Sequence, residues 1–129
     1  MNAPPGLKYS KTHEWVAVDG DIATVGITAF AVELLSDVVN IELPAVGRSL
    51  QQGEPFGEIE SVKHVSDLYA PVSGTVVAVN TELADRLESL GRDPYHNGWM
   101  IKLRMERPAD VDRLLDAAAY EAHCAAESH

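Results

Sequence analysis

The sequence predicts a mainly β protein, a sandwich or flattened barrel of short antiparallel strands with a short early helix and a C-terminal helix. Three observations indicate this class. Short runs rich in β-branched and aromatic residues recur along the chain. Glycine, proline, asparagine or aspartate bounds each run. Helical spacing of apolar residues is confined to one segment near residue 30 and one near the C-terminus. Such patterns are typical of sandwiches and small barrels, and we expect roughly seven or eight strands.

The first predicted elements are a β-hairpin and a helix. Apolar runs at 14–18 and 22–27 flank an Asp-Gly-Asp turn at 19–21, and Asp-Gly between apolar runs is a strong hairpin signal. Thr28 can cap the helix that follows, because its hydroxyl can accept a hydrogen bond from a backbone N–H of the first turn. The apolar residues of this helix, at helical spacing, are Ala31, Leu34 and Leu35.

Residues 37–44 predict the next strand, because apolar and polar residues alternate until Pro44. One face is expected to carry Val39, Ile41 and Leu43. The other face is expected to carry Val38, Asn40 and Glu42. Since Asn40 shares its face with Glu42, we expect it to lie outside the deep core.

Four further strands are predicted. Each is a short run bounded by turn residues, and they occupy 54–62, 65–70, 74–80 and 99–104. Residues 81–98, before the last of these strands, are expected to be irregular, with a turn at the sequence DPYHNG.

The C-terminal helix is expected at about 110–124, with Asp110 as its cap after Pro108. Its apolar stripe, at a period of about 3.6 residues, is Val111, Leu114, Leu115, Ala118, Ala119 and Ala122. The whole chain, residues 1–129, is expected to be a single domain with its core at about 7–105, because the length suits one domain and no linker composition interrupts it.

Composition bears on the class of partner. The 129 residues carry a formal net charge of −10, and 46% of them are hydrophobic, which is ordinary for a globular core. The surplus of acids argues against nucleic acid, whose phosphates are bound mainly by lysine and arginine, and against anionic membranes. It suits docking on basic patches of other proteins, so we expect protein partners.

The N-terminal sequence MNAPPGLKYSK lacks the apolar core of a signal peptide and the arginine-rich pattern of a transit peptide. No apolar run approaches the length that spans a membrane. The single cysteine, Cys124, permits no intramolecular disulfide, which is compatible with a reducing compartment. These features predict a cytoplasmic, bacterial protein.

The spacing of the histidines and of the single cysteine indicates neither a metal site nor a catalytic site. The five histidines are His13, His64, His96, His123 and His129. They form no H-x-x-x-H or H-E-x-x-H pair, and no cysteine cluster accompanies them, so no metal site is predicted. His123 and Cys124 are adjacent, so on a helix they diverge by about 100° and make a poor catalytic pair. No residue is therefore assigned a catalytic role.

Lys63 lies in the stretch GEIESVKHVSDLYAPVSG, residues 57–74, between two predicted strands. Val62 and Val65 are expected to anchor those strands and to leave Lys63 and His64 at the apex of a tight, exposed turn. A primary amine in such a turn can form an amide with a carboxylic acid cofactor, because a modifying enzyme can close around it. On spacing alone, an ordinary solvated hairpin lysine accounts for the same pattern.

Several stretches between about 6 and 121 carry a family resemblance: LKYSKTHEW, TVGIT, ELLSDVV, IELPAVG, FGEIESVKHVSD, APVSGTVVAVN, DPYHNGWMIK and LLDAAAYE. On these the chain resembles the H protein of the glycine cleavage system, a relative of the lipoyl domains of 2-oxoacid dehydrogenases. The combination of ESVK with HEW and the PY…GW loop is specific. Biotin carriers flank their lysine with methionines, and 2-oxoacid dehydrogenase lipoyl domains usually have aspartate before it. Here Val62 and His64 flank Lys63.

The resemblance implies a lipoyl/biotinyl-like fold and a non-catalytic carrier subunit. Lipoic acid is expected in amide linkage to Lys63, attached by a lipoate ligase or octanoyltransferase. The arm is expected to shuttle the aminomethyl group of glycine from the pyridoxal-phosphate glycine decarboxylase (P protein) to the tetrahydrofolate aminomethyltransferase (T protein). Dihydrolipoamide dehydrogenase (L protein) is then expected to reoxidise it. The hard chemistry belongs to the cofactors, and the carrier supplies attachment, orientation and shelter.

A surface cleft for the loaded arm is also implied. The hydroxyl residue and two acids of that cleft in the family match Thr12, Glu14 and Asp67. We expect Glu14 and Asp67 to bind the ammonium group of the arm, which needs such partners when it leaves bulk water. Exclusion of water there suppresses loss of ammonia and formaldehyde. Acids that are merely solvated are the simpler alternative. The residues expected to guide lipoylation are Glu60, Ser61, Val62 and His64.

Some positions match related domains and others depart from them. Gly47 and Gly74 match glycines of lipoyl domains, and we expect positive φ or a close backbone approach there. Residues 84–92, ADRLESLGR, are the least typical, because relatives commonly have proline where Leu87 stands. That loss predicts a more flexible or more helical connection. Gly91 is expected to take the left-handed conformation that asparagine tolerates.

Two other functions stay open at the level of sequence. An H-like protein that relays octanoyl or lipoyl groups to other lipoyl domains needs Lys63 but not Glu14 and Asp67. An unmodified regulatory interaction domain could keep the fold without the cofactor. The intact ESVK motif argues against that second alternative, because an abandoned site has no chemical reason to keep its lysine.

Overall fold

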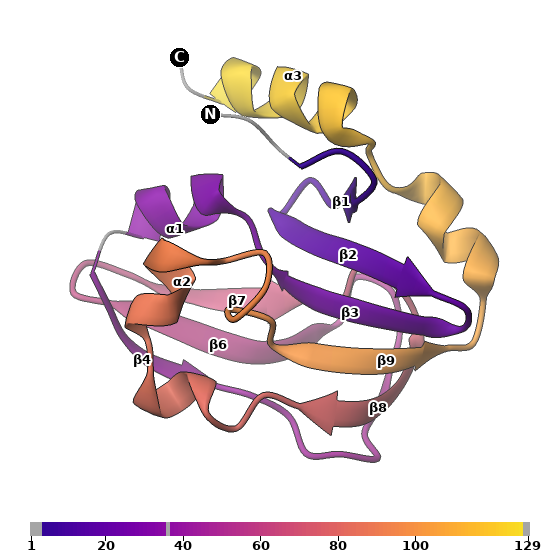
Figure 1. The fold of residues 1–129 in the computed structure, drawn as a ribbon, viewed down its shortest axis with the longest axis horizontal. Coiled ribbons are helices and arrows are strands. Elements are labelled where there is room, and N and C mark those ends of the chain that lie inside the picture. Colours follow the sequence, from indigo (N-terminus) through magenta and orange to yellow (C-terminus); the bar gives the residue numbers. More distant parts are fainter. Residues whose placement is uncertain (1–3, 36, 128–129) are drawn as a thin grey trace.

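The computed structural model describes residues 4–35 and 37–127 and confirms the predicted sandwich. Two antiparallel sheets pack against each other, and neither closes into a barrel (Figure 1). In spatial order, the larger sheet consists of β1 (Lys8–Tyr9), β2 (Glu14–Asp19), β3 (Ile22–Ile27), β9 (Ile101–Met105), β8 (Gly74–Val79) and β5 (Ser49–Leu50). The smaller sheet consists of β4 (Val38–Glu42), β6 (Pro55–Ser61) and β7 (Val65–Tyr69).

Helices cover one end and one edge of the sandwich. They are α1 (Ala29–Leu35), the 3-10 helix η1 (Leu83–Asp85), α2 (Glu88–Arg92), the 3-10 helix η2 (Pro108–Arg113) and α3 (Ala117–Glu127). Helices α1 and α2 lie side by side, and α3 lies over β1 (Figure 1). Within the described ranges, none of these helices has the length and apolar character needed to cross a membrane.

The predicted hairpin and helix cap are both confirmed. Strands β2 and β3 form the hairpin, in which Asp19 pairs with Ile22 and Gly20 has a φ of 63°. Thr28 caps α1, because its hydroxyl accepts a hydrogen bond of 3.3 Å from the Ala31 N–H. The hairpin turn and the helix cap each depend on residues within a few positions of one another, so both could be predicted from the sequence.

Strand β4 departs from the predicted alternation. Ile41 is buried as expected, but Val39 is 50% exposed, whereas Val38 packs against the core. The pairing of β4 with β6 shifts register between Val38 and Asn40. Such a β-bulge inserts one residue, so the side chains before it change faces. Asn40 is exposed, as expected.

The segment expected to be irregular is instead partly helical, since it contains η1 and α2. Leu87, at the start of α2, has helical dihedrals, with φ −60° and ψ −25°. The more helical connection expected from the missing proline is therefore found. The left-handed turn expected at Gly91 is wrong, because Gly91 lies inside α2 without a positive φ.

The single helix expected at 110–124 is wrong, because the chain there is broken in two. Leu115 exchanges two backbone hydrogen bonds with Tyr9, of 2.8 and 2.7 Å, and this pairing requires extended backbone between η2 and α3. Asp110 does not cap α3, since its carboxylate accepts the Ser73 N–H at 3.0 Å. Asp116 is the cap and accepts the Ala119 N–H at 2.8 Å.

The buried face of α3 also differs from the predicted stripe. Helix α3 buries Tyr120 and Cys124 in a second cluster with Tyr9 and Trp15, beside the main core between the sheets. The Tyr9 and Tyr120 rings stack with centroids 4.7 Å apart. The alanines expected to face the core are exposed, namely Ala118, Ala119 and Ala122. Burial of large aromatic area outweighs burial of alanine methyl groups, so it sets the helix orientation.

The expected glycine roles are found. Gly47 has a φ of 98°. Gly74 sits where a Cβ would lie 2.3 Å from the Arg104 carbonyl oxygen on the paired strand. Because a backbone carbonyl cannot easily move aside, Gly74→Ala is expected to lower the free energy of unfolding by about 3 kcal/mol in urea denaturation.

Gly91→Ala is the matched control for that substitution. Nothing lies within 4 Å of a Cβ at Gly91, which is inside α2. Alanine is the better helix former, so stability is expected to rise by up to about 1 kcal/mol. Equal destabilisation by both changes would contradict the close-approach explanation for Gly74.

Candidate functional site

Lys63 lies at the tip of the β6–β7 hairpin, in a turn that Ser61 organises. The Ser61 N–H donates to the His64 carbonyl at 2.8 Å. The Ser61 hydroxyl accepts the N–H groups of Lys63 at 3.3 Å and His64 at 3.1 Å. The Val62 N–H donates to the Asp37 carbonyl at 3.0 Å and ties the turn to the strand beside it. The Lys63 side chain is exposed, so a fixed turn presents its amine to solvent.

The neighbours of Lys63 are placed partly as expected. Val62 and Val65 do not anchor the strands by buried side chains, because each is 63% exposed. Val65 nevertheless begins β7 and pairs with Glu60 of β6, whereas Val62 lies in the turn. The apex consists of Val62 and Lys63 rather than Lys63 and His64, because the hydrogen bonds of Ser61 to His64 close the turn. The buried Ser61 hydroxyl therefore shapes the turn rather than facing a partner. The exposed residues among those expected to guide lipoylation are Glu60, Val62 and His64.

Thr12, Glu14 and Asp67 line one cleft of about 140 Å³ between α1, β2 and β7. The structure therefore brings the three predicted cleft residues together. Apolar side chains form much of the remaining wall, among them Ile27, Leu34, Leu35 and Leu68. The cleft combines an apolar wall with a hydroxyl and two acids, which suits a long apolar arm that ends in a cation.

The chain itself joins Lys63 to this cleft. Asp67 lies on β7, four residues after Lys63. A strand residue advances by about 3.3 Å, and part of this segment is turn, so the separation is at most about 13 Å. An extended arm on the amine of Lys63 can therefore reach the cleft.

Glu14 is the buried acid of the cleft, with only 1% of its surface exposed. The Ser10 hydroxyl donates to its Oε1 at 2.6 Å, and the Thr12 hydroxyl donates to the same oxygen. The Tyr69 N–H donates to Oε2 at 3.3 Å. Sequence reasoning missed Ser10 and Tyr69, because neither the turn before β2 nor the contact with β7 has a periodic signal.

Burial raises the pKa of Glu14 from its ordinary 4.5 to about 7, although the hydrogen bonds from Ser10, Thr12 and Tyr69 oppose that shift. The cleft thus holds a carboxyl that is poised between its two forms at neutral pH. A cation that enters the cleft favours the ionised form, because opposite charges attract strongly where water is scarce.

This burial predicts a pH dependence of stability. The folded protein keeps the Glu14 proton up to about pH 7, whereas the unfolded chain releases it near pH 4.5. Because the folded state binds more protons in this window, the free energy of unfolding is expected to fall as the pH rises through it, by up to about 3 kcal/mol.

Glu14→Gln is expected to remove this pH-dependent part of the free energy of unfolding, because glutamine does not titrate. The measurement is urea denaturation of both proteins at several pH values between 4.5 and 8. Asp67→Asn is the control, because Asp67 is an exposed acid of the same cleft. If the free energy of unfolding of Glu14→Gln fell with pH as steeply as that of the unsubstituted protein, Glu14 would not be the group responsible.

The HEW and PY…GW motifs meet beside the cleft. The Trp15 indole N–H donates to the Pro94 carbonyl at 2.9 Å. The Tyr95 hydroxyl accepts the N–H of Ala29, the first residue of α1, at 3.1 Å. The loop before β9 therefore holds both β2 and α1, which are two walls of the cleft.

His13, next to Glu14, has an unusual backbone for a residue with a side chain. Its φ is 75°, in the left-handed region. The His13 N–H donates to the Ser10 carbonyl at 3.1 Å, and the His13 carbonyl accepts the Thr28 N–H at 3.0 Å. These bonds maintain a conformation that costs free energy, and they direct Glu14 into the cleft.

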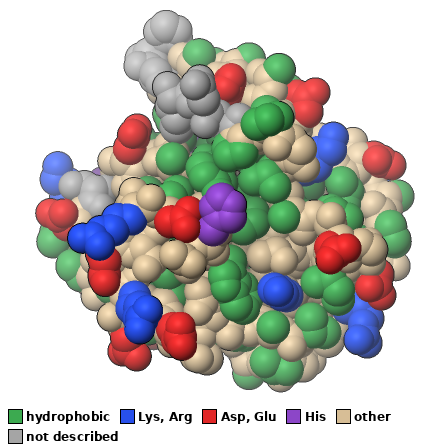
Figure 2. Space-filling view, viewed as in Figure 1, with side chains coloured by type: hydrophobic (Ala, Val, Ile, Leu, Met, Phe, Trp, Pro, Cys, Tyr) green, Lys and Arg blue, Asp and Glu red, His purple; other side chains and the backbone are tan. Residues whose placement is uncertain are grey.

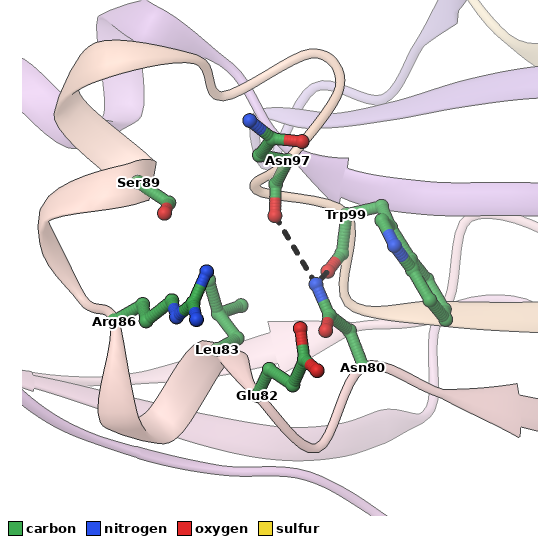
Figure 3. A pocket seen from close by; sticks show the side chains of 7 residues that line it. All are labelled: Asn80, Glu82, Leu83, Arg86, Ser89, Asn97 and Trp99. Atoms are coloured by element: carbon green, nitrogen blue, oxygen red, sulfur yellow. Dashed lines mark hydrogen bonds between the residues drawn. The ribbon is translucent and has the colours of Figure 1, made fainter.

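A second, polar pocket lies between η1, α2 and the loop before β9 (Figure 3). Figure 3 shows the Arg86 side chain extending into it, with Asn80 opposite. The Asn80 amide donates to the carbonyls of Asn97 at 3.1 Å and Trp99 at 2.9 Å, which fixes the loop. Among the described residues, none lines both this pocket and the cleft.

Comparison with known proteins identifies one family. The family model described as Glycine cleavage H-protein matches residues 7–127. A protein of Symbiobacterium thermophilum named glycine cleavage system H protein is 59% identical, over 94% of each chain. A protein of the same name from Acaryochloris marina is 54% identical, over 92% of this chain and 93% of the other.

A solved structure shows the same fold. The crystal structure of a glycine cleavage system H protein from Mycobacterium marinum superposes with a TM-score of 0.86 at 40% identity. The match covers 93% of this chain and 97% of that one.

Proposed function

The chain belongs to the glycine cleavage H-protein family, and on that premise we propose that it is a lipoyl carrier whose cofactor is attached to Lys63. The observation that carries the proposal is the geometry of the hairpin and the cleft. An exposed lysine stands on a fixed turn, and a cleft of matching chemistry lies within reach of an arm attached to it.

The residues present fit a lipoyl group. The Lys63 amine is exposed, as amide formation by a second enzyme requires. The apolar wall of the cleft, which includes Leu34 and Leu68, suits the hydrocarbon part of the arm. When bound, the lipoyl group supplies two sulfur atoms that carry a one-carbon amine fragment and accept two electrons.

The polar residues of the cleft then have separate tasks. Glu14 and Asp67 supply carboxylates for the ammonium end of the loaded arm. The hydroxyls of Ser10 and Thr12 donate to Glu14 and hold its carboxylate in one orientation. Hydrogen bonds between the carboxylates and the ammonium group are stronger inside the cleft than in water, because both groups are charged and water is scarce there. They therefore hold the end of the arm where water is excluded.

The partners proposed are the glycine decarboxylase, the aminomethyltransferase and dihydrolipoamide dehydrogenase, together with a lipoate ligase or octanoyltransferase. We propose that the chain acts as a carrier and leaves catalysis to these enzymes, and that its setting is the cytoplasm. A net charge of −10 supports docking on basic surfaces. On the face in Figure 2, acidic and basic side chains are mixed around the rim, so the acidity is not gathered in one patch there. We further propose that residues 1–129 act as one domain.

The relay and regulatory alternatives are less well supported. A relay of lipoyl groups needs the exposed amine of Lys63 but no acid that is 1% exposed and held by two hydroxyls. An unmodified regulatory domain needs neither feature. The buried Glu14 beside a fixed, exposed lysine therefore favours the carrier of glycine cleavage.

The experiment that tests the proposal is reconstitution of glycine oxidation. The lipoylated protein is mixed with the three partner enzymes, glycine, tetrahydrofolate and NAD, and NADH is followed. We expect NADH formation that depends on both glycine and the lipoylated protein. Transfer of lipoyl groups to other lipoyl domains without glycine-dependent NADH formation would instead support the relay.

A further inference from the structure

His13, which precedes β2, meets His123 and Glu127 of α3 beside the cleft, although more than a hundred residues separate it from them. Glu127 of α3 accepts a hydrogen bond from His13 Nε2 at 2.8 Å on one carboxylate oxygen. It lies 3.1 Å from His123 Nε2 through the other oxygen. The two imidazole rings lie 5.7 Å apart. One ligand atom from each residue falls within 4.8 Å of the others. The histidine spacings in the sequence gave no sign of this cluster, because only packing of α3 brings it together.

A second set of contacts orients the histidine rings. The other ring nitrogen of His13, Nδ1, lies 2.8 Å from the Tyr120 hydroxyl, which in turn lies 2.6 Å from the Thr28 hydroxyl. The other tautomer of His13, with its proton on Nδ1, donates to the Tyr120 hydroxyl and frees the lone pair of Nε2 for a cation that replaces the hydrogen bond to Glu127. Metal-binding histidines are commonly held in this way by a partner on their other nitrogen.

We propose that His13, His123 and Glu127 form a binding site for Zn²⁺ or a chemically similar divalent transition metal. Two imidazoles and one carboxylate are a ligand set that zinc accepts, with a fourth position left for water or another group. Bonds of about 2.1 Å place neighbouring ligands of a tetrahedral ion about 3.4 Å apart. His13 Nε2 and His123 Nε2 lie 2.8 and 3.1 Å from the two different carboxylate oxygens of Glu127. Because the ligand atoms of the three residues lie within 4.8 Å of one another, the side chains need to shift by on the order of 1 Å to reach this spacing.

The metal would replace the hydrogen bonds that the cluster makes without it. His123 Nε2 also lies 3.0 Å from the Lys11 carbonyl, and metal binding removes that contact. In return, three bonds to one ion tie α3 to the turn before β2. This turn also carries Thr12 and leads directly into Glu14, the first residue of β2, so the ion would fix one wall of the cleft. The inference does not depend on lipoylation of Lys63.

The test is a zinc titration of the full-length protein after removal of metals with EDTA. The lysine variant Lys63→Arg is the parent, because it lacks the thiols of a reduced lipoyl arm, which bind zinc themselves. Competition with a zinc indicator is expected to show one site. His123→Gln and Glu127→Gln are each expected to lower its affinity by at least about tenfold.

His96→Gln is the matched control. His96 Nδ1 lies 2.9 Å from the Asp93 carboxylate, so it is a histidine–carboxylate pair at a similar distance. Its substitution is expected to leave zinc affinity unchanged. Zinc is also expected to raise the unfolding temperature of the parent but not of His123→Gln or Glu127→Gln, because it binds only the folded state.

Three results would overturn the proposal. The first is no stoichiometric zinc binding at millimolar concentrations. The second is an unchanged zinc affinity in both His123→Gln and Glu127→Gln, which would place the ion elsewhere. The third is a thiolate charge-transfer band in the spectrum of the Co²⁺ form, because it would make Cys124 a ligand in place of the proposed set.

Discussion

Lys63→Arg is expected to fold like the unsubstituted protein and to abolish glycine oxidation in the reconstituted system. Arginine keeps a positive charge at the tip of the β6–β7 hairpin, but its guanidinium does not form the amide that attaches lipoate. The side chain is exposed, and the turn is held by Ser61 and by backbone groups rather than by the lysine amine. Lipoylation and NADH formation are therefore both expected to fall to background, while the free energy of unfolding changes by less than about 0.5 kcal/mol.

Lys102→Arg is the matched control for this substitution. Lys102 lies on β9 with its amine 5.3 Å from the centre of the Trp99 ring, an interaction that arginine can also make. Its lipoylation and activity are expected to equal those of the unsubstituted protein. Retained glycine oxidation in Lys63→Arg would mean that the cofactor is attached elsewhere.

The double substitution Glu14→Gln with Asp67→Asn is expected to shorten the lifetime of the loaded arm. Both side chains line the cleft, and the change removes both carboxylates while keeping similar side-chain volumes. A hydrogen bond to a charged group contributes about 1.5–3 kcal/mol, so spontaneous release of ammonia and formaldehyde is expected to rise by at least about tenfold. The measurement follows formaldehyde release from the loaded protein after the decarboxylase is removed.

A control variant distinguishes the effect of the cleft acids on the release rate from the effect of losing negative charge anywhere on the surface. Glu58→Gln removes an exposed acid that pairs across the strands with Asp67 but does not line the cleft. It is expected to leave the release rate unchanged. Of the single substitutions, Glu14→Gln is expected to have the larger effect, because Glu14 is buried and Asp67 is exposed. An unchanged release rate in the double variant would show that the acids are merely solvated.

Sequence predicted the elements that neighbouring residues determine. The Asp-Gly turn at 19–21 and the Thr28 cap depend on chemistry within a few positions, and both are found. The break before α3 could not be predicted, because it depends on the pairing of Leu115 with Tyr9. The bulge that turns Val39 outward likewise depends on the register of β4 against β6.

The residues of the candidate site also fall into two groups, those that the sequence predicted and those that depend on how the elements pack. Motif resemblance led to Lys63, Glu14 and Asp67, and the structure places the two acids in one cleft. The Tyr69 N–H that reaches Glu14 belongs to the other sheet, and such a contact is decided by how the sheets pack. The cluster of His13 with α3 was missed for the same reason, because histidine spacing reports only ligands on one element.

Lipoyl attachment to Lys63 is tested most simply by the intact mass of the protein purified from its native host, followed by peptide mapping. We expect a gain of one lipoyl group, localised to Lys63 and absent from Lys63→Arg. Incubation with glycine and the decarboxylase is then expected to add the aminomethyl fragment to the modified form alone. An unmodified Lys63 in cells supplied with lipoate would contradict the carrier function, and the proposed roles of Glu14 and Asp67 would fail with it.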